Sequence, residues 1–121
     1  MFRVRLGNDL PFVWRNALET KLAVLFASDR DRGAAREILS PVLECPEPER
    51  TAVACLKLSD GDLARLKEYV DAATADYRDV LAWAEYPRQM RLGPSAPPAD
   101  QARARREDMN EYARWLKSSL K

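Results

Sequence analysis

Cysteine and carboxylate side chains are the main groups in this sequence that could do chemistry, because the chain contains no histidine. Histidine is the commonest general base and transition-metal ligand, so its absence excludes serine–histidine and cysteine–histidine nucleophiles. Cys45 and Cys55 lie ten residues apart, without a CxxC motif or a neighbouring set of metal ligands. We therefore expect Cys45 in a loop and Cys55 as a small residue of the core.

Acidic residues cluster at two places in the sequence. Asp76 and Asp79 share a helix face beside Arg78, and carboxylate clusters bind magnesium or divide acid and base roles. A dinuclear carboxylate site would need Glu-x-x-His motifs, which this chain lacks. Residues 60–62 match the start of a calcium loop, but an amphipathic helix follows them directly. We interpret residues 60–62 as a helix cap and Asp76 and Asp79 as part of a solvated, ion-paired helix face, and we expect no metal, no cofactor and no enzymatic activity.

Residues 76–88 are unusually dense in tyrosine, tryptophan and arginine, which are enriched at binding hot spots. Trp83 and Tyr86 lie off the apolar seam of their predicted helix. Either they pack against another element, or they form an exposed aromatic patch. The candidate partner-binding residues are Arg78, Trp83, Tyr86, Arg88 and Arg91.

The C-terminal part of the chain is basic. Residues 87–121 carry 8 Lys and Arg against 4 Asp and Glu, whereas residues 1–86 carry 12 against 15. Arginine beside aromatic residues clamps phosphates and stacks on bases, although acidic residues on the same helix reduce the positive field. The candidate nucleic-acid-binding residues are Arg103, Arg105, Arg106 and Trp115.

These patterns support two hypotheses of function from different classes. The first is a non-enzymatic protein–protein interaction or regulatory module, whose partner is another protein or a second copy in a homo-oligomer. The alternative is a nucleic-acid-binding accessory protein that uses the basic C-terminal helix. The net charge of +1 over the whole chain favours neither nucleic acid nor an acidic substrate.

The elements that must position these residues are predicted to be helices. With 121 residues and only 4 glycines, the composition indicates a single-domain, all-α bundle of four to five helices over residues 1–121. Its clearest element is a long central helix over about residues 60–86, capped by Ser59 or Asp60. Apolar residues there recur at steps of three and four: Leu63, Leu66, Val70, Ala73, Tyr77, Val80 and Ala84.

The remaining elements are less regular. Residues 51–58 fit a strand or a helix, and we favour the helix. The proline-rich residues 87–98 predict a linker or loop before a final helix over residues 100–120. Residues 1–8 alternate apolar and basic side chains, which indicates an edge strand or an extended arm, and we favour the arm.

The sequence also bears on the cell compartment. Its N-terminus lacks the apolar stretch of a signal peptide, and the longest apolar run, residues 22–27, is far shorter than the roughly 20 residues of a membrane span. We therefore expect a cytoplasmic protein with reduced thiols and no membrane partner. Arginine outnumbers lysine 15 to 5, which suggests a GC-rich bacterial genome.

Overall fold

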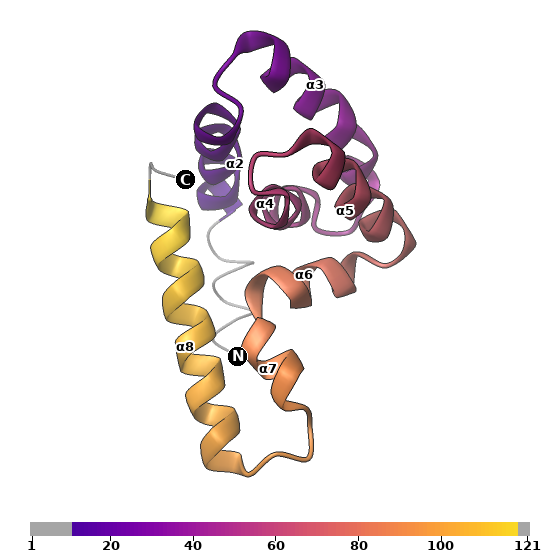
Figure 1. The fold of residues 1–121 in the computed structure, drawn as a ribbon. Coiled ribbons are helices and arrows are strands. Elements are labelled where there is room, and N and C mark those ends of the chain that lie inside the picture. The colour runs from indigo at the N-terminus through magenta and orange to yellow at the C-terminus, as the bar shows by residue number, and fades with distance from the viewer. Residues whose placement is uncertain (1–10, 119–121) are drawn as a thin grey trace.

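The protein is a bundle of helices in the computed structural model, which describes residues 11–118 (Figure 1). This confirms the predicted all-α class. The predicted arm at residues 1–8 lies outside the described residues. The elements in chain order are α2 (Pro11–Leu25), α3 (Asp29–Leu39), the 3-10 helix η1 (Ser40–Glu44), α4 (Pro48–Ser59), α5 (Leu63–Ala75), α6 (Tyr77–Glu85), α7 (Pro87–Leu92) and α8 (Pro98–Lys117).

Helix α4 lies at the centre of the bundle. Its six consecutive residues from Thr51 to Leu56 are all buried, and α2, α5, α6 and η1 pack around it (Figure 1). A helix that is apolar on every side must be covered on every side. The prediction of a helix over residues 51–58 is therefore confirmed, and the buried position of Cys55 within it is confirmed as well.

The prediction of one long helix over residues 60–86 is wrong. The chain forms α5 and α6 instead, with Asp76 between them in an extended conformation at φ −160° and ψ 102°. The carboxylate of Asp76 accepts a hydrogen bond at 3.0 Å from the backbone N–H of Arg78 and so caps α6. Aspartate side chains compete with helical backbone hydrogen bonds in this way. The central helix is therefore α4.

Most residues of the predicted apolar seam are still buried, although they lie on two helices rather than on one. Leu66 and Val70 on α5 and Val80 and Ala84 on α6 are buried, because each helix turns this face toward α4. The cap of α5 also differs from our expectation: Asp62 caps it, with its Oδ1 2.8 Å from the backbone N of Ala64.

The segment over residues 87–98 is a second correction, because it begins with α7 rather than with a loop. Proline is favoured in the first turn of a helix, where its missing N–H would have no partner, and Pro87 starts α7. The amide of Gln101 then donates to the carbonyls of Pro94 at 2.9 Å and Ala96 at 2.7 Å, which fixes the shortened loop to the start of α8. Helices α7 and α8 pack together as a hairpin (Figure 1).

These two differences explain the number of helices. The described part of the chain contains seven α-helices rather than four to five. None of the helices within residues 11–118 combines the length and the apolar character needed to cross a bilayer.

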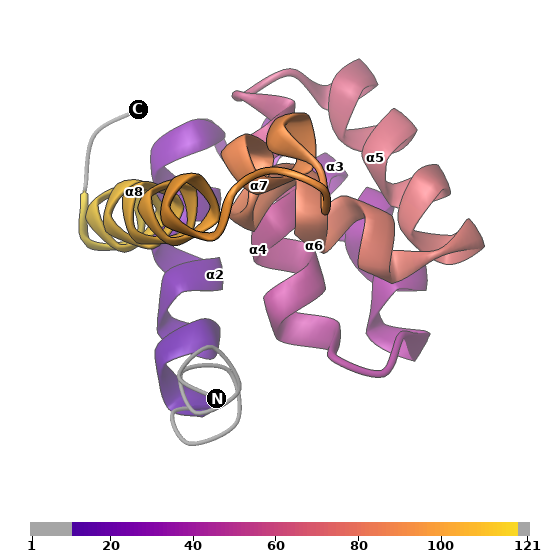
Figure 2. The same ribbon diagram turned by 90° about the horizontal axis from the view of Figure 1, so that it is seen from below.

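The C-terminal end of α8 lies beside α2 (Figures 1 and 2). Lys21 on α2 is fully buried, and its Nζ donates to the carbonyl of Ser118 at 2.5 Å and lies 4.3 Å from the centre of the Trp115 ring. Burial lowers the pKa of Lys21. A cation at a helix C-terminus offsets the negative end of the helix dipole, so Lys21 secures the last turn of α8.

Truncation of α4 should destabilise the fold far more than the same truncation at the surface. Leu56 is fully buried, so we expect Leu56→Ala to lower the free energy of unfolding by about 2–5 kcal/mol. The matched control is Leu43→Ala, at a side chain that is 56% exposed on η1, with an expected change of about 0.5 kcal/mol or less. Urea unfolding followed by far-ultraviolet circular dichroism measures both. Equal losses would contradict the central position of α4.

Candidate functional site

The structure divides the five candidate partner-binding residues into two groups. Tyr86 and Arg88 are engaged in contacts within the protein, and their environments are described below. Arg78, Trp83 and Arg91 are exposed, although Arg78 also forms an ion pair with Asp76 at 3.0 Å. The aromatic segment is therefore only partly available to a partner.

Tyr86 belongs to a half-buried network that joins α4 to α6. The guanidinium of Arg50 donates to both carboxylate oxygens of Glu85, at 2.8 and 2.6 Å, and to the hydroxyl of Tyr86 at 3.2 Å. It also donates to Glu47 at 3.0 Å. Burial alone would lower the pKa of Arg50, but the hydrogen bonds to Glu85 and Glu47 more than offset it and raise the pKa above its ordinary value. The network thus pairs the positive charge of Arg50 with the negative charge of Glu85 inside the protein.

Arg88 belongs to a second network, centred on the buried carboxylate of Asp108. The Asp108 side chain on α8 accepts hydrogen bonds at 3.1 Å from the backbone N–H groups of Arg88 and Gln89, and so caps α7 from a different helix. The guanidinium of Arg88 donates to Asp108 at 3.2 Å and to Glu111. The bond from Arg88 lowers the pKa of Glu111. Arg88 is therefore a structural residue rather than a free contact for a partner.

Three large apolar side chains on α6 and α7 are exposed. Trp83 is 40% exposed, Met90 54% and Leu92 39%. The Trp83 ring packs edge-to-face against Tyr69 of α5, with 6.3 Å between the ring centres. This contact fixes one side of the indole and leaves the remainder at the surface. We call Trp83, Met90 and Leu92 the α6–α7 face.

The candidate nucleic-acid-binding residues also fall into two groups, one exposed and one packed against the core. Arg103, Arg105 and Arg106 are exposed on α8. Trp115 instead packs against the core, stacks on Tyr112 with 5.8 Å between ring centres, and lies under Lys21. A tryptophan held in this way is not a free platform for bases. Helical spacing could have indicated this, because Tyr112 and Trp115 share the inward face of α8 with Asp108.

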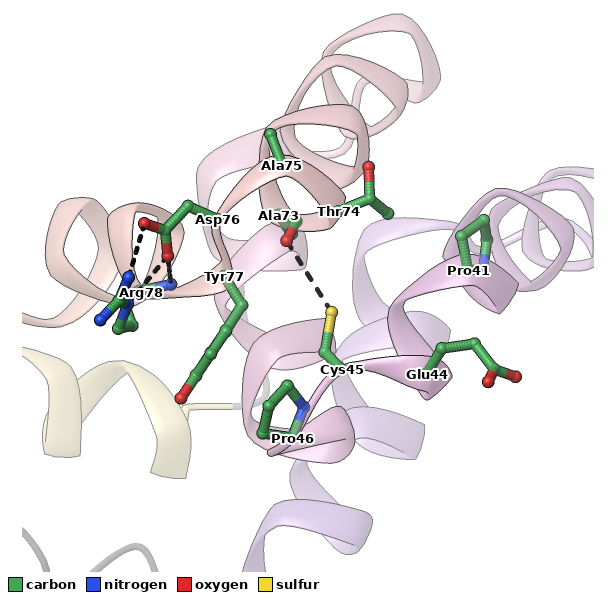
Figure 3. Close-up of a pocket in the computed structure, with 10 residues that line it drawn as sticks. All are labelled: Pro41, Glu44, Cys45, Pro46, Ala73, Thr74, Ala75, Asp76, Tyr77 and Arg78. Carbon is green, nitrogen blue, oxygen red and sulfur yellow. Dashed lines mark hydrogen bonds and ion pairs between the residues drawn. The ribbon is translucent and has the colours of Figure 1, made fainter.

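A groove of about 490 Å³ lies where η1 meets the junction of α5 and α6 (Figure 3). Cys45, Glu44 and Arg78 are among the residues that line it, and the Sγ of Cys45 lies 3.8 Å from the carbonyl of Ala73. Burial raises the pKa of the Cys45 thiol, which reduces the thiolate needed for nucleophilic attack. The predicted loop position of Cys45 is confirmed.

The acidic residues of the described chain do not assemble into a metal centre. Within residues 11–118, no group of three or more cysteine or acidic side chains is placed to hold a metal ion. Asp76 and Asp62 instead cap α6 and α5, whereas the sequence predicted Ser59 or Asp60 as the cap and placed Asp76 within a continuous helix.

No family model, no curated protein and no solved structure matches the chain.

Loss of the Asp108 carboxylate should destabilise the hairpin of α7 and α8. Asp108→Asn keeps the side-chain shape but turns a donor toward the N–H groups that cap α7, so we expect a loss of about 3 kcal/mol in the free energy of unfolding. The control is Glu107→Gln, because Glu107 is an exposed partner of Arg88 at 3.6 Å and should contribute about 0.5 kcal/mol or less. Chemical denaturation distinguishes the two, and similar losses would refute the role of Asp108.

The two thiols should differ in reactivity. Burial and the neighbouring Cys45 raise the pKa of Cys55 to about 12, so Cys55 should resist iodoacetamide at neutral pH while the protein is folded. Cys45 should react, but more slowly than a free thiol such as glutathione. Mass spectrometry of timed samples measures both rates, and denatured protein is the control. Faster reaction of Cys45 than of glutathione would indicate an activated nucleophile.

Proposed function

We propose that the protein is a non-enzymatic protein–protein interaction module that binds its partner through the α6–α7 face. One observation carries the proposal. Of the four large apolar side chains that are exposed within residues 16–118, three lie on these two successive helices: Trp83, Met90 and Leu92. Aromatic residues and methionine are enriched at protein interaction surfaces, and tryptophan is among the residues enriched at hot spots.

A second copy of the chain fits this face by chemistry. Exposed Asp79 precedes Trp83 by one helical turn on α6, and exposed Arg91 lies between Met90 and Leu92 in the sequence of α7. In a two-fold contact each surface meets itself in the reverse direction. The apolar centres would then face each other, and Arg91 of one copy would approach Asp79 of the other.

Other features agree with a binding role. The thiol of Cys45 lines the groove at η1, and its raised pKa disfavours thiolate chemistry at neutral pH. Cys45 and Cys55 are free thiols, as expected in the reducing cytoplasm, where we place the protein. The arginine-rich composition supports a bacterial source.

Removal of the α6–α7 face should weaken self-association while the fold remains intact. We expect the double variant Trp83→Ser/Met90→Ser to weaken dimerisation by about 30-fold or more, because truncation of a hot spot costs about 2 kcal/mol or more. Sedimentation equilibrium over a range of protein concentrations measures the constant. Tyr86 and Arg88 are left unchanged, because their substitution would break internal hydrogen bonds.

The control is Leu43→Ser, which removes the fourth exposed apolar side chain, on η1, and should leave dimerisation unchanged. Circular dichroism establishes that each variant is folded. A wild-type protein that sediments as a monomer at every concentration would refute self-association through this face, and so would an equal effect of the control.

A further inference from the structure

The positive charge of α8 is less compensated than its sequence suggests. The helix contains four acidic residues, and all of them form ion pairs with only two arginines. Asp100 pairs with Arg103 at 2.5 Å. The other three converge on Arg88 of α7: Glu107, Asp108 and Glu111. Most of the acidic charge of α8 is therefore directed toward α7.

Four of the five cations of α8 lie along one face of the helix. Positions 103, 106, 110, 114 and 117 recur at steps of three and four, so they share one face of the helix. All five are exposed. Asn110 occupies the middle position, and the other four define the cationic face of α8: Arg103, Arg106, Arg114 and Lys117. At a rise of about 1.5 Å per residue, this face is about 21 Å long.

This face points away from the rest of the protein. The opposite side of α8 carries buried Ala104, Asp108 and Tyr112, and α8 forms one edge of the molecule in both views (Figures 1 and 2). Within residues 11–118, the side chains of Arg106, Arg114 and Lys117 form no ion pair and no hydrogen bond. Three of the four cations are therefore available without breaking an internal contact.

We propose that the cationic face of α8 binds the phosphate backbone of a nucleic acid duplex without reading its sequence. A row of cations over about 21 Å matches the regular negative charge of a duplex, which presents one phosphate for roughly each 1.7 Å of its axis. Arginine also matches phosphate geometry with two parallel hydrogen bonds. This activity is independent of the α6–α7 face.

One further observation favours a duplex over a single strand, and another indicates which side of the protein meets the duplex. Single-strand binding relies on aromatic side chains that stack on bases, and Trp115 is instead packed between Tyr112 and Lys21. Residues 1–86 carry more acidic than basic residues, so they repel a polyanion. Contact is therefore confined to α8 and to the phosphate backbone.

Fluorescence anisotropy with a labelled DNA duplex of about 20 base pairs tests the proposal, at about 50 mM and about 200 mM salt. Four phosphate contacts predict a slope of about −3 to −4 in log affinity against log salt concentration. The variant Arg106→Gln/Arg114→Gln should reduce the magnitude of the slope by about 2 and weaken binding roughly tenfold or more at the lower salt. Both side chains lack internal partners within the described residues, so the variant should fold normally.

The matched control is Arg30→Gln/Arg65→Gln, which removes the same charge from exposed positions on α3 and α5 and should bind like the wild type. No duplex binding at about 50 mM salt, or equal weakening by both variants, would overturn the proposal. Tighter binding of a single strand of the same sequence would overturn the assignment to a duplex. If polyglutamate bound through Arg106 and Arg114 while DNA did not, the partner would be an acidic protein instead.

Discussion

The burial of α4 on all sides is the constraint on which the rest of the structure depends. A helix without an exposed face needs neighbours around its whole circumference, and each neighbour must direct an apolar face toward it. Helix α4 has 12 residues and is therefore only about 18 Å long, whereas an unbroken helix over residues 60–86 would extend for about 40 Å. The break at Asp76 allows both halves of the apolar seam to pack against α4.

Two buried carboxylates impose a second constraint, because a buried charge must be paired. Glu85 recruits Arg50 across the boundary between α4 and α6, and Asp108 recruits Arg88 and the N-terminus of α7. Breaking such a pair leaves an uncompensated buried charge, so these contacts are costly to lose even though their net contribution to stability is modest. Arginines that look available in the sequence are therefore committed to holding helices together.

Two surfaces of different chemistry are not used by contacts within the protein. The α6–α7 face is apolar, and the cationic face of α8 is positively charged and carries no aromatic platform. The two faces belong to elements that pack together as one hairpin and its neighbour. If the first face holds two copies together, the assembly presents two cationic faces, and simultaneous contact with one duplex would increase the apparent affinity. The two proposals are thus separable by mutation but compatible in one molecule.

The sequence by itself determined the all-α class, the buried seam from Leu66 to Ala84 and the positions of the two cysteines, and it favoured a helix over a strand for residues 51–58. Periodicity and composition record such features directly, because they depend on neighbours along one helix. Only the tertiary structure decided that Asp76 divides the predicted central helix, that residues after Pro87 form α7, and that Arg88 is internal while Arg106 is free. These outcomes depend on contacts between helices distant in sequence, and no local pattern specifies which carboxylate an arginine will meet.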